Sequence, residues 1–259
     1  MPPDLPNGLL AALVAELDGP SVTGIALGGS YARGDANPFS DVDLAAFVPD
    51  GRPVPAKRLI VRDGYLVSIS WKTCAAWREG LSHPERAILL APSARALRIL
   101  LDRDGSLARL VEAGRRFEWA PLQAEADRFA SQLLALTAEH ARKTLAALVA
   151  RDELALSTAL ASMASHSVLA VATQRGIMIT SENTLARQVI ESVGESSLWA
   201  HALRLALGAT GTPGLLAARG QAALGLYGET AALLREVLRA DDLPAITATT
   251  RLIAASYPA

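Results

Sequence analysis

Cysteine is nearly absent from this chain, which has a single thiol, Cys74, among its 259 residues. One thiol can form neither a disulfide within the chain nor a cysteine-based zinc cluster. Disulfide-stabilised secreted domains and zinc domains built on cysteine are therefore excluded. We expect a reducing compartment, the cytoplasm, as the location of this protein.

The chain also has almost no net charge and no long apolar run. It carries 25 Lys and Arg against 26 Asp and Glu, with a formal net charge of -1 and a pI near 6.4. Without a chain-wide positive field, a nucleic-acid partner is disfavoured. No apolar run reaches the roughly eighteen residues of a membrane span, so we expect none. The acidic, proline-containing N-terminus does not resemble a signal peptide.

The residue composition changes near Trp119. Before it, strand-like and helix-like apolar patterns alternate, whereas after it alanine and leucine dominate and β-branched runs are scarce. A chain of this length is sufficient for two modest domains. We therefore predict an α+β protein in which residues 1–118 form a mixed-sheet domain and residues 119–259 form an all-helical bundle.

Periodicity and turn residues predict the elements of each domain. Helices are expected over 9–17 and 106–117, a helical turn over 30–35, and strands over 22–29, 41–49 and 95–102. Two more strands within 57–71 are joined by Asp63-Gly64, a dipeptide suited to a tight hairpin turn. His83, next to Pro84, can start a helix. In the second domain, amphipathic stretches around 129–140 and 156–167 precede about three more helices.

One stretch, GGSYARGDANPFSDVDL over residues 28–44, carries the strongest chemical signal. Gly29 has no Cβ and lets the backbone approach a ligand, while Ser30 offers a hydroxyl at a helix start, where phosphate binds well. Asp41 and Asp43 point to one face of a strand and repel each other unless a cation lies between them. Magnesium is the cation that such carboxylates favour. The alternative is a helix capped by Ser30, followed by two solvated aspartates at a strand end.

Gly29, Ser30, Asp41 and Asp43, placed on a strand, a helical turn and a second strand, resemble the signature of the DNA polymerase β-type nucleotidyltransferase superfamily. The resemblance implies that the N-terminal domain is a nucleotidyltransferase domain. It also implies that the two aspartates hold two magnesium ions on a nucleoside triphosphate, and that an acceptor hydroxyl attacks the α-phosphorus. AMP is the group that we expect to be transferred.

The superfamily usually has a third carboxylate on a later strand, where this chain has Val67-Ser68-Ile69. The Ser68 hydroxyl stays protonated at neutral pH, so it replaces neither a metal-binding carboxylate nor an efficient base. Either activity is lost, or the base comes from elsewhere in the chain. Glu139 and Lys143, four residues apart on one helix face, are the candidates. An ordinary exposed ion pair is the other interpretation of these two residues.

The chain also resembles kanamycin (aminoglycoside 4'-) nucleotidyltransferase. This resemblance implies that Glu139 is the general base, that Lys143 contacts the triphosphate, and that Thr180 binds nucleotide. Arg33 and Ser40 also match an arginine and a serine in the loop of that enzyme. It further implies a small-molecule acceptor, with an aminoglycoside as one option, and a homodimer.

Two other functions stay open at this point. A toxin-like nucleotidyltransferase would act on a protein or a tRNA end, although the near-neutral charge disfavours this. A catalytically impaired nucleotide-binding protein would explain Ser68. Trp71, Trp77, His166 and Tyr227 are expected to pack in the protein rather than to bind a ligand.

Overall fold

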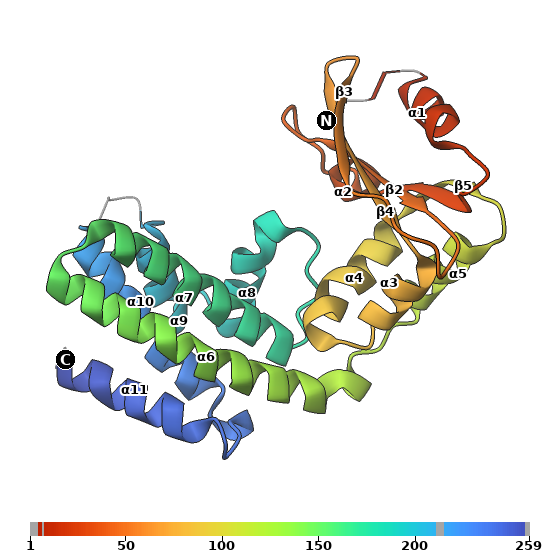
Figure 1. Ribbon diagram of the computed structural model, residues 1–259. Coiled ribbons are helices and arrows are strands. Elements are labelled where there is room, and N and C mark those ends of the chain that lie inside the picture. The colour runs from red at the N-terminus through yellow and green to blue at the C-terminus, as the bar shows by residue number, and fades with distance from the viewer. Residues whose placement is uncertain (1–4, 7, 211–214, 257–259) are drawn as a thin grey trace. The chain divides into compact units, whose positions relative to one another are not determined.

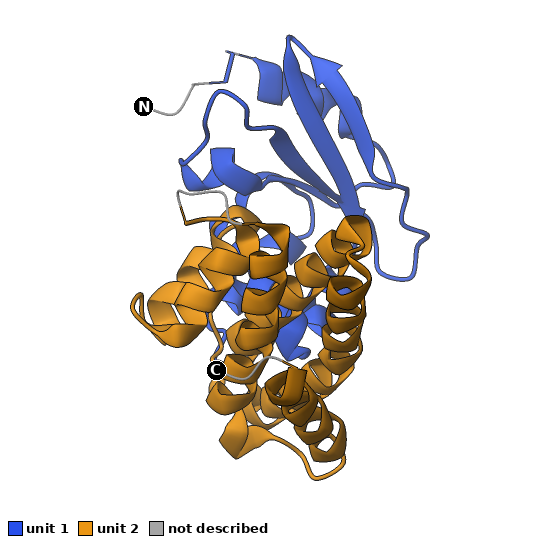
Figure 2. Ribbon diagram, turned by 90° about the vertical axis from the view of Figure 1, so that its left-hand side faces the viewer, with its two compact units in different colours: residues 1–118 blue, residues 119–259 orange. Residues whose placement is uncertain are grey.

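The computed structural model of the protein describes residues 5–6, 8–210 and 215–256 (Figure 1). The chain divides into two compact units, residues 1–118 and residues 119–259 (Figure 2). Unit 1 contains the sheet, and unit 2 is helical in its described residues. An α+β fold with a helical C-terminal region is therefore confirmed.

A five-stranded mixed sheet forms the centre of unit 1. Its strands are β1 (Gly24–Leu27), β2 (Val42–Phe47), β3 (Arg58–Arg62), β4 (Tyr65–Lys72) and β5 (Arg98–Asp102), in the spatial order β3-β4-β2-β1-β5. The β2–β4 pair is parallel, and the other neighbours are antiparallel. The predicted hairpin is confirmed, because Arg62 pairs with Tyr65 across Asp63 and Gly64, which both have positive φ.

The two faces of the sheet bury alternate residues, as the period of a strand requires. On one face, Leu27 and Leu44 pack with helix α1 (Leu9–Leu17), and we call this the α1 face. On the other face, Ala45 and Phe47 belong to a cluster with residues of three helices, and we call this the α3–α5 face. These helices are α3 (Cys74–Gly80), α4 (Pro84–Ala96) and α5 (Ser106–Arg115).

The region between β4 and β5 differs from the sequence prediction. Helix α3 was not predicted, and α4 only by its start next to His83, where Pro84 occupies the first helical turn. The strand predicted over 95–102 is shorter, because α4 continues to Ala96 and β5 begins at Arg98. Pro92 inside α4 weakens the helical signal of the sequence, since proline removes a backbone donor.

Unit 2 is built on two long consecutive helices, α6 (Gln123–Ala150) and α7 (Glu153–Gln174). The 28 residues of α6 give it a length of about 42 Å. The helices α8 (Leu185–Val193), α9 (Leu198–Leu207), α10 (Leu216–Leu233) and α11 (Leu243–Ser256) follow. The described part of the chain thus has four α-helices after Gly176 instead of about three.

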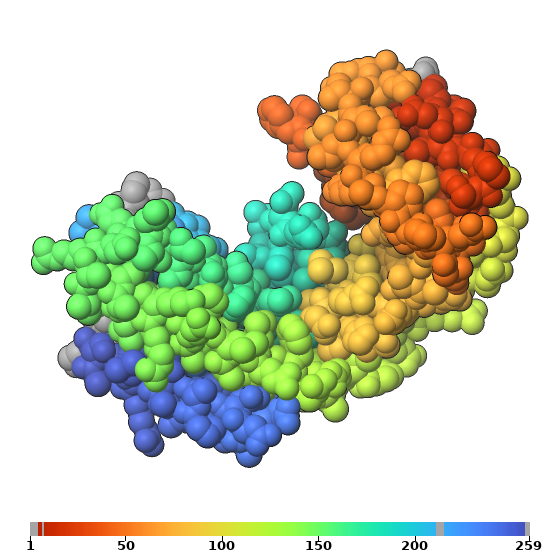
Figure 3. Space-filling model, in the orientation of Figure 1, coloured from red at the N-terminus to blue at the C-terminus, as the bar shows by residue number. Residues whose placement is uncertain are grey.

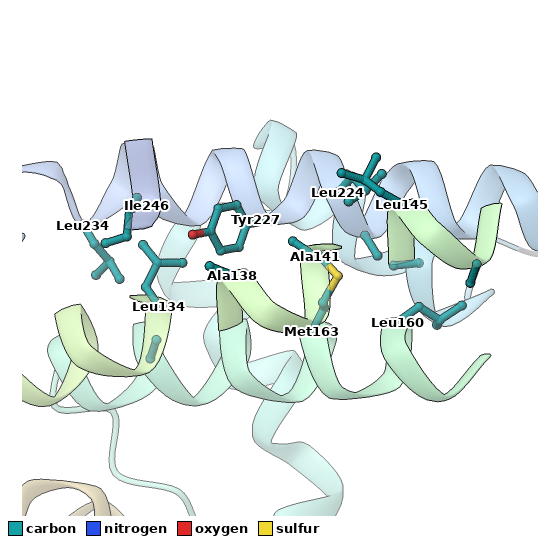
Figure 4. Close-up of a cluster of buried hydrophobic side chains, with 14 of the residues drawn as sticks. Leu134, Ala138, Ala141, Leu145, Leu160, Met163, Leu224, Tyr227, Leu234 and Ile246 are labelled. Atoms are coloured by element: carbon teal, nitrogen blue, oxygen red, sulfur yellow. The ribbon is translucent and has the colours of Figure 1, made fainter. Parts of the chain in front are cut away.

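The core of unit 2 joins α6, α7, α10 and α11. Figure 4 shows Leu134 and Ala141 of α6 with Met163 of α7, Tyr227 of α10 and Ile246 of α11. Helix α7 is long and apolar enough to cross a membrane by length and composition alone. Half of its most apolar window is buried within the unit, as in the core helix of a globular domain. The apolar residues of α7 are thus accounted for by packing.

Tyr227 packs, as expected, in the core of unit 2. Its side chain is fully buried, and its hydroxyl has no hydrogen-bond partner among the described residues. Burial raises the pKa of this phenol far above its ordinary value, with a small opposing effect from Arg142. A buried and unpaired hydroxyl destabilises the fold, because it loses its hydrogen bonds to water.

We expect Tyr227→Phe to stabilise the protein, because the substitution removes the unpaired hydroxyl and keeps the ring. The expected gain is about 1 kcal/mol, which corresponds to a rise in Tm of about 2–4 °C. Tyr227→Ala is the contrasting variant and should cost about 3–5 kcal/mol through the cavity that it leaves. Thermal unfolding followed by circular dichroism measures both effects. A loss of stability in Tyr227→Phe would show that the hydroxyl is satisfied.

Candidate functional site

Gly29 and Asp43 share one small volume at the end of β1. The Gly28 backbone N–H donates to the carbonyl oxygen of Asp43 at 2.8 Å, which joins the two strands at this point. Gly29 has φ +62, and a Cβ added to it would clash with Oδ2 and Cγ of Asp43. Glycine is therefore required here both by the backbone conformation and by the carboxylate beside it.

Helix α2 (Gly29–Arg33) follows directly and is only five residues long. Its N-cap is Gly28, and no side chain caps it, so Ser30 is not the N-cap residue. The interpretation of Ser30 as a mere helix cap is thus wrong, and no hydrogen bond of its hydroxyl is recorded within the described residues. The Ser30 carbonyl accepts from the N–H groups of Gly34 and Asp35, which closes the turn after the helix.

Asp41 and Asp43 flank the first residue of β2, Val42, and both are half-buried. The pKa of Asp43 is raised, first by burial and then by repulsion from Asp41, while Lys57, the Ser68 hydroxyl and Arg33 oppose the rise. A carboxylate held close to a second one in this way is stabilised when a cation binds between them. The predicted proximity of the two aspartates is therefore present in the structure.

The other two residues matched in this region are Arg33, the last residue of α2, and Ser40, in the loop between α2 and β2. Ser40 closes a tight turn, since its hydroxyl oxygen accepts from the Asn37 N–H at 2.9 Å. Arg33 forms an ion pair with Asp35 at 3.1 Å, and the Asp35 side chain is largely exposed. Exposed ion pairs contribute little to stability, so an anionic ligand can compete with Asp35 for the guanidinium.

Ser68 lies opposite Asp43 in the parallel β2–β4 register. It is buried, and its hydroxyl lowers the pKa of Asp43 by hydrogen bonding. Position 68, where the third carboxylate was predicted, thus lies next to Asp43, and the residue found there is a serine, a neutral hydrogen-bond donor. Within the described residues, no three His, Cys, Asp or Glu side chains form a group that could hold a metal ion.

Two lysines that the sequence analysis missed, Lys57 and Lys72, act electrostatically on Asp43. Lys72 ends β4, and its Nζ lies 4.7 Å from the centroid of the Trp77 ring. Trp77 is buried and stacks on Phe47 with ring centroids 5.9 Å apart, so it packs as expected. The pKa of Lys72 is lowered by burial and by Lys57, and raised in part by Asp43.

The donor set at Asp41 and Asp43 fits a magnesium ion. Hard carboxylate oxygens are the ligands that this ion prefers, and it usually keeps several waters and binds substrate phosphates as well. Two protein carboxylates are therefore sufficient for one such ion when a nucleotide supplies the remaining ligands. The repulsion between Asp41 and Asp43, which after burial is the second cause of the raised pKa of Asp43, is the observation that supports this fit.

Unit 2 carries the other part of the predicted site. Glu139 Oε1 and Lys143 Nζ form an ion pair at 2.6 Å, with side chains 71% and 58% exposed. Hydrogen bonding from Lys143 and its charge lower the pKa of Glu139. The structure thus brings these two side chains together. The geometry by itself fits either a catalytic pair or an exposed i,i+4 ion pair.

A groove of about 630 Å³ lies between α6 and α7, beside Lys143. Alanines form much of its wall, with polar atoms from His140, Thr158 and Ser162. Among the described residues that line it, the one carboxylate is that of Asp152, which caps α7 by accepting from Leu154 N and Ala155 N. A polycationic ligand would therefore meet the carboxylate of Asp152 in the described lining, and that of Glu139 where it pairs with Lys143.

Thr180 and His166 lie elsewhere in unit 2. Thr180 is in the loop between α7 and α8, where its backbone N–H donates to Gln188 Oε1 at 3.3 Å. His166 lies in α7, 3.3 Å from Thr137 Oγ1 through Nδ1, with its ring against that of His140. Burial and His140 lower the pKa of His166, which favours the neutral ring. His166 therefore packs, as expected.

Comparison with known proteins supports the assignment of unit 1. Residues 10–82 match the family described as nucleotidyltransferase domain, a range that contains β1, α2, β2 and Ser68. This part of unit 1 thus matches a nucleotidyltransferase domain, and the match supports a nucleotidyltransferase. Comparison with curated proteins gave no match.

Among solved structures, the chain is similar to a nucleotidyltransferase-like protein from Exiguobacterium sibiricum 255-15. The two share 14% sequence identity over 96% of this chain and 79% of that chain, with a TM-score of 0.47.

Proposed function

We propose that the protein transfers a nucleoside monophosphate, AMP, from a nucleoside triphosphate to a hydroxyl of a small molecule. The acceptor oxygen forms a bond to the α-phosphorus, and the bond from this phosphorus to the β-phosphate oxygen breaks. Pyrophosphate leaves with the electron pair of that bond, and the acceptor proton passes to a base. The observation that carries the proposal is the Gly29–Asp43 contact beside Asp41, within a nucleotidyltransferase domain.

The proposed site residues of unit 1 each have a role that their surroundings support. Asp41 and Asp43 would hold magnesium, which neutralises the charge that develops on the phosphates. Ser30 offers an unused hydroxyl beside Gly29, and Ser40 and Arg33 offer a hydroxyl proton and an exchangeable guanidinium. We assign these three side chains to the phosphates.

We assign the base to Glu139, whose basicity would depend on whether Lys143 pairs with it or with a phosphate of the nucleotide. In the pair, Lys143 keeps the pKa of Glu139 low, so the carboxylate is a weak base. When Lys143 turns to a phosphate, Glu139 loses this partner and its pKa rises toward the range useful for proton transfer. We therefore assign proton removal to Glu139 and phosphate binding to Lys143, with Thr180 as a further nucleotide contact.

The kanamycin nucleotidyltransferase resemblance supports a small-molecule acceptor, and the alanine-rich groove beside Lys143 favours one with few positive charges. An aminoglycoside is therefore the less favoured acceptor of this class. We also propose a cytoplasmic location, from the single buried cysteine, and a homodimer, from the same resemblance.

The proposal is tested by incubating the protein with magnesium, nucleoside triphosphates labelled at the α-phosphate, and a panel of hydroxyl-bearing small molecules. Transfer of label to an acceptor, with release of pyrophosphate, is the expected result. The panel should contain aminoglycosides together with less charged alcohols and glycosides. Label on the protein itself or on tRNA, with none on small molecules, would contradict the proposed acceptor class.

Ser68 favours one other function, that of a nucleotide-binding protein without transfer activity. A neutral residue stands where the superfamily usually has a carboxylate. Calorimetry distinguishes the two functions when combined with the acceptor panel. Magnesium-dependent triphosphate binding without transfer to any acceptor would favour the binding protein.

A further inference from the structure

One face of the sheet carries a row of polar residues that starts at Asp43. The β2–β4 register places Ser68 beside Asp43, and by the alternation of a strand Ser70 and Lys72 lie on the same face. Ser68 also pairs with Leu59, and Ile69 with Arg58. Continuing this antiparallel pairing by one residue places Lys57 beside Ser70. We call Asp43, Ser68, Ser70, Lys72 and Lys57 the polar strip.

The polar strip lies on the α3–α5 face of the sheet, next to a part of it that stays open. Neighbouring side chains on the same face, Leu59 and Val61, are 60% and 72% exposed. The β3–β4 hairpin, drawn in orange, lies at the surface of unit 1 (Figure 3). The Lys57 end of the strip is therefore accessible from the β3 side, while Ser68 is buried.

Neither Lys57 nor Lys72 forms an ion pair with a described residue. Lys57 is exposed, and the Lys72 ammonium lies over the Trp77 ring, 4.7 Å from its centroid. By contrast, the nearby Arg62 pairs with Glu16, and Arg78 pairs with Asp50 at 3.5 Å. Two positive charges on this face, neither of them neutralised by an ion pair with a described residue, thus interact with Asp43 and can bind an anionic ligand.

We infer that Lys57 and Lys72 bind the β- and γ-phosphates of the triphosphate and replace the charge of a second divalent cation, so that the site works with one. The inference rests on the proposed function, and it adds two phosphate-binding residues and a metal count. The two ammonium groups together carry the charge of one divalent ion. Ser68 explains why a second ion is not held, because the position beside Asp43 offers no carboxylate.

The electrostatics of the strip agree with this inference. The two lysines lie close enough for Lys57 to lower the pKa of Lys72. An anion placed between like charges relieves this repulsion, as a triphosphate would do here. The charged groups acting on the strip are Asp43 and Asp41 at one end, Arg33 beside them, and the two lysines farther along.

The first experiment counts metal ions in the complex with α,β-methylene ATP, an analogue that cannot release pyrophosphate. Native mass spectrometry of the full chain, with Mn²⁺ in place of Mg²⁺, measures the count without any turnover. One Mn²⁺ per bound analogue is expected. Two ions in the wild-type complex would overturn the inference.

The second experiment measures the affinity of matched variants for the same analogue and for AMP. Lys72→Met removes the ammonium that lies over the Trp77 ring and keeps a long unbranched side chain, and Lys57→Met makes the equivalent change. Each should weaken binding of the analogue about tenfold, the contribution of one charge-assisted hydrogen bond, and leave AMP binding unchanged. Arg58→Met is the control, because Arg58 is exposed and points to the opposite face. An effect of Arg58→Met as large as that of the lysines, or an equal loss for AMP, would contradict the assignment.

The results separate this inference from the proposed function. If wild-type protein transfers label but the lysine variants bind the analogue normally, the inference fails and the function stands. If wild-type protein binds no analogue at all, the proposed function itself fails.

Discussion

Asp43→Asn is expected to abolish nucleotidyl transfer and, at the same time, to stabilise the protein in the absence of metal. Activity should fall by at least about 10³-fold, because a metal-binding carboxylate is lost. Stability should rise because burial and Asp41 disfavour the charge on Asp43. About 1 kcal/mol corresponds to a rise in Tm of about 2–4 °C in a protein of this size. Transfer of α-label and thermal unfolding in EDTA measure the two effects.

The pH dependence of this stability difference has a definite sign. A carboxyl group whose pKa is raised by folding is protonated in both states at acidic pH, where its charge imposes no penalty. The penalty appears as the pH rises through the raised pKa. The Tm difference between Asp43→Asn and wild type should therefore be larger at neutral than at acidic pH.

Magnesium supplies a further control for Asp43→Asn. Adding the ion together with nucleotide should raise the Tm of the wild type, since a ligand that binds only the folded state stabilises it. The variant should gain much less. Asp41→Asn should also lose activity. Wild-type transfer rates in either variant would show that these aspartates do not hold the metal.

Glu139→Gln is expected to lower turnover by about 10²-fold while leaving nucleotide affinity nearly unchanged. The amide has nearly the shape of the carboxylate but cannot take the acceptor proton. Single-turnover rates with α-labelled triphosphate, together with calorimetric affinity for the analogue, measure the two quantities separately. An exposed ion pair without a catalytic role would leave both near their wild-type values.

Glu125→Gln is a matched control for this experiment. Glu125 lies on the same helix, α6, and forms an ion pair with Arg128 three residues later. Its substitution removes a comparable surface pair at a place to which we assign no chemistry. If both variants lost turnover equally, the effect would come from helix α6 in general and Glu139 would not be the base.

Local patterns in the sequence were sufficient for most of unit 1. The hairpin at Asp63-Gly64 is an example, because a two-residue turn fixes the register of β3 against β4. With that register, Lys57 falls beside Ser70 and shares its face, so the hairpin signal in the sequence is sufficient to place this lysine. Alternation along β4 then adds Lys72 to the same face.

Other features depend on pairing between distant segments, which no local pattern specifies. The parallel register of β2 and β4 places Ser68 beside Asp43, although 24 residues lie between them in the sequence. The contact of Gly29 with Asp43 is of the same kind. Helix α3 was missed because it is a short segment whose Trp77 is fixed by packing on Phe47. Side-chain packing, more than propensity, determines such segments.

The contact between Gly29 and Asp43 also constrains how such an enzyme can change. The turn assigned to phosphate and the carboxylate assigned to metal occupy adjoining atoms, so neither can gain volume without displacing the other. A substitution at position 29 would therefore displace the Asp43 carboxylate even though Gly29 has no side chain of its own. Under the proposed function, a change of acceptor is more readily accommodated elsewhere, such as in the groove walls of unit 2, while these two positions stay fixed together.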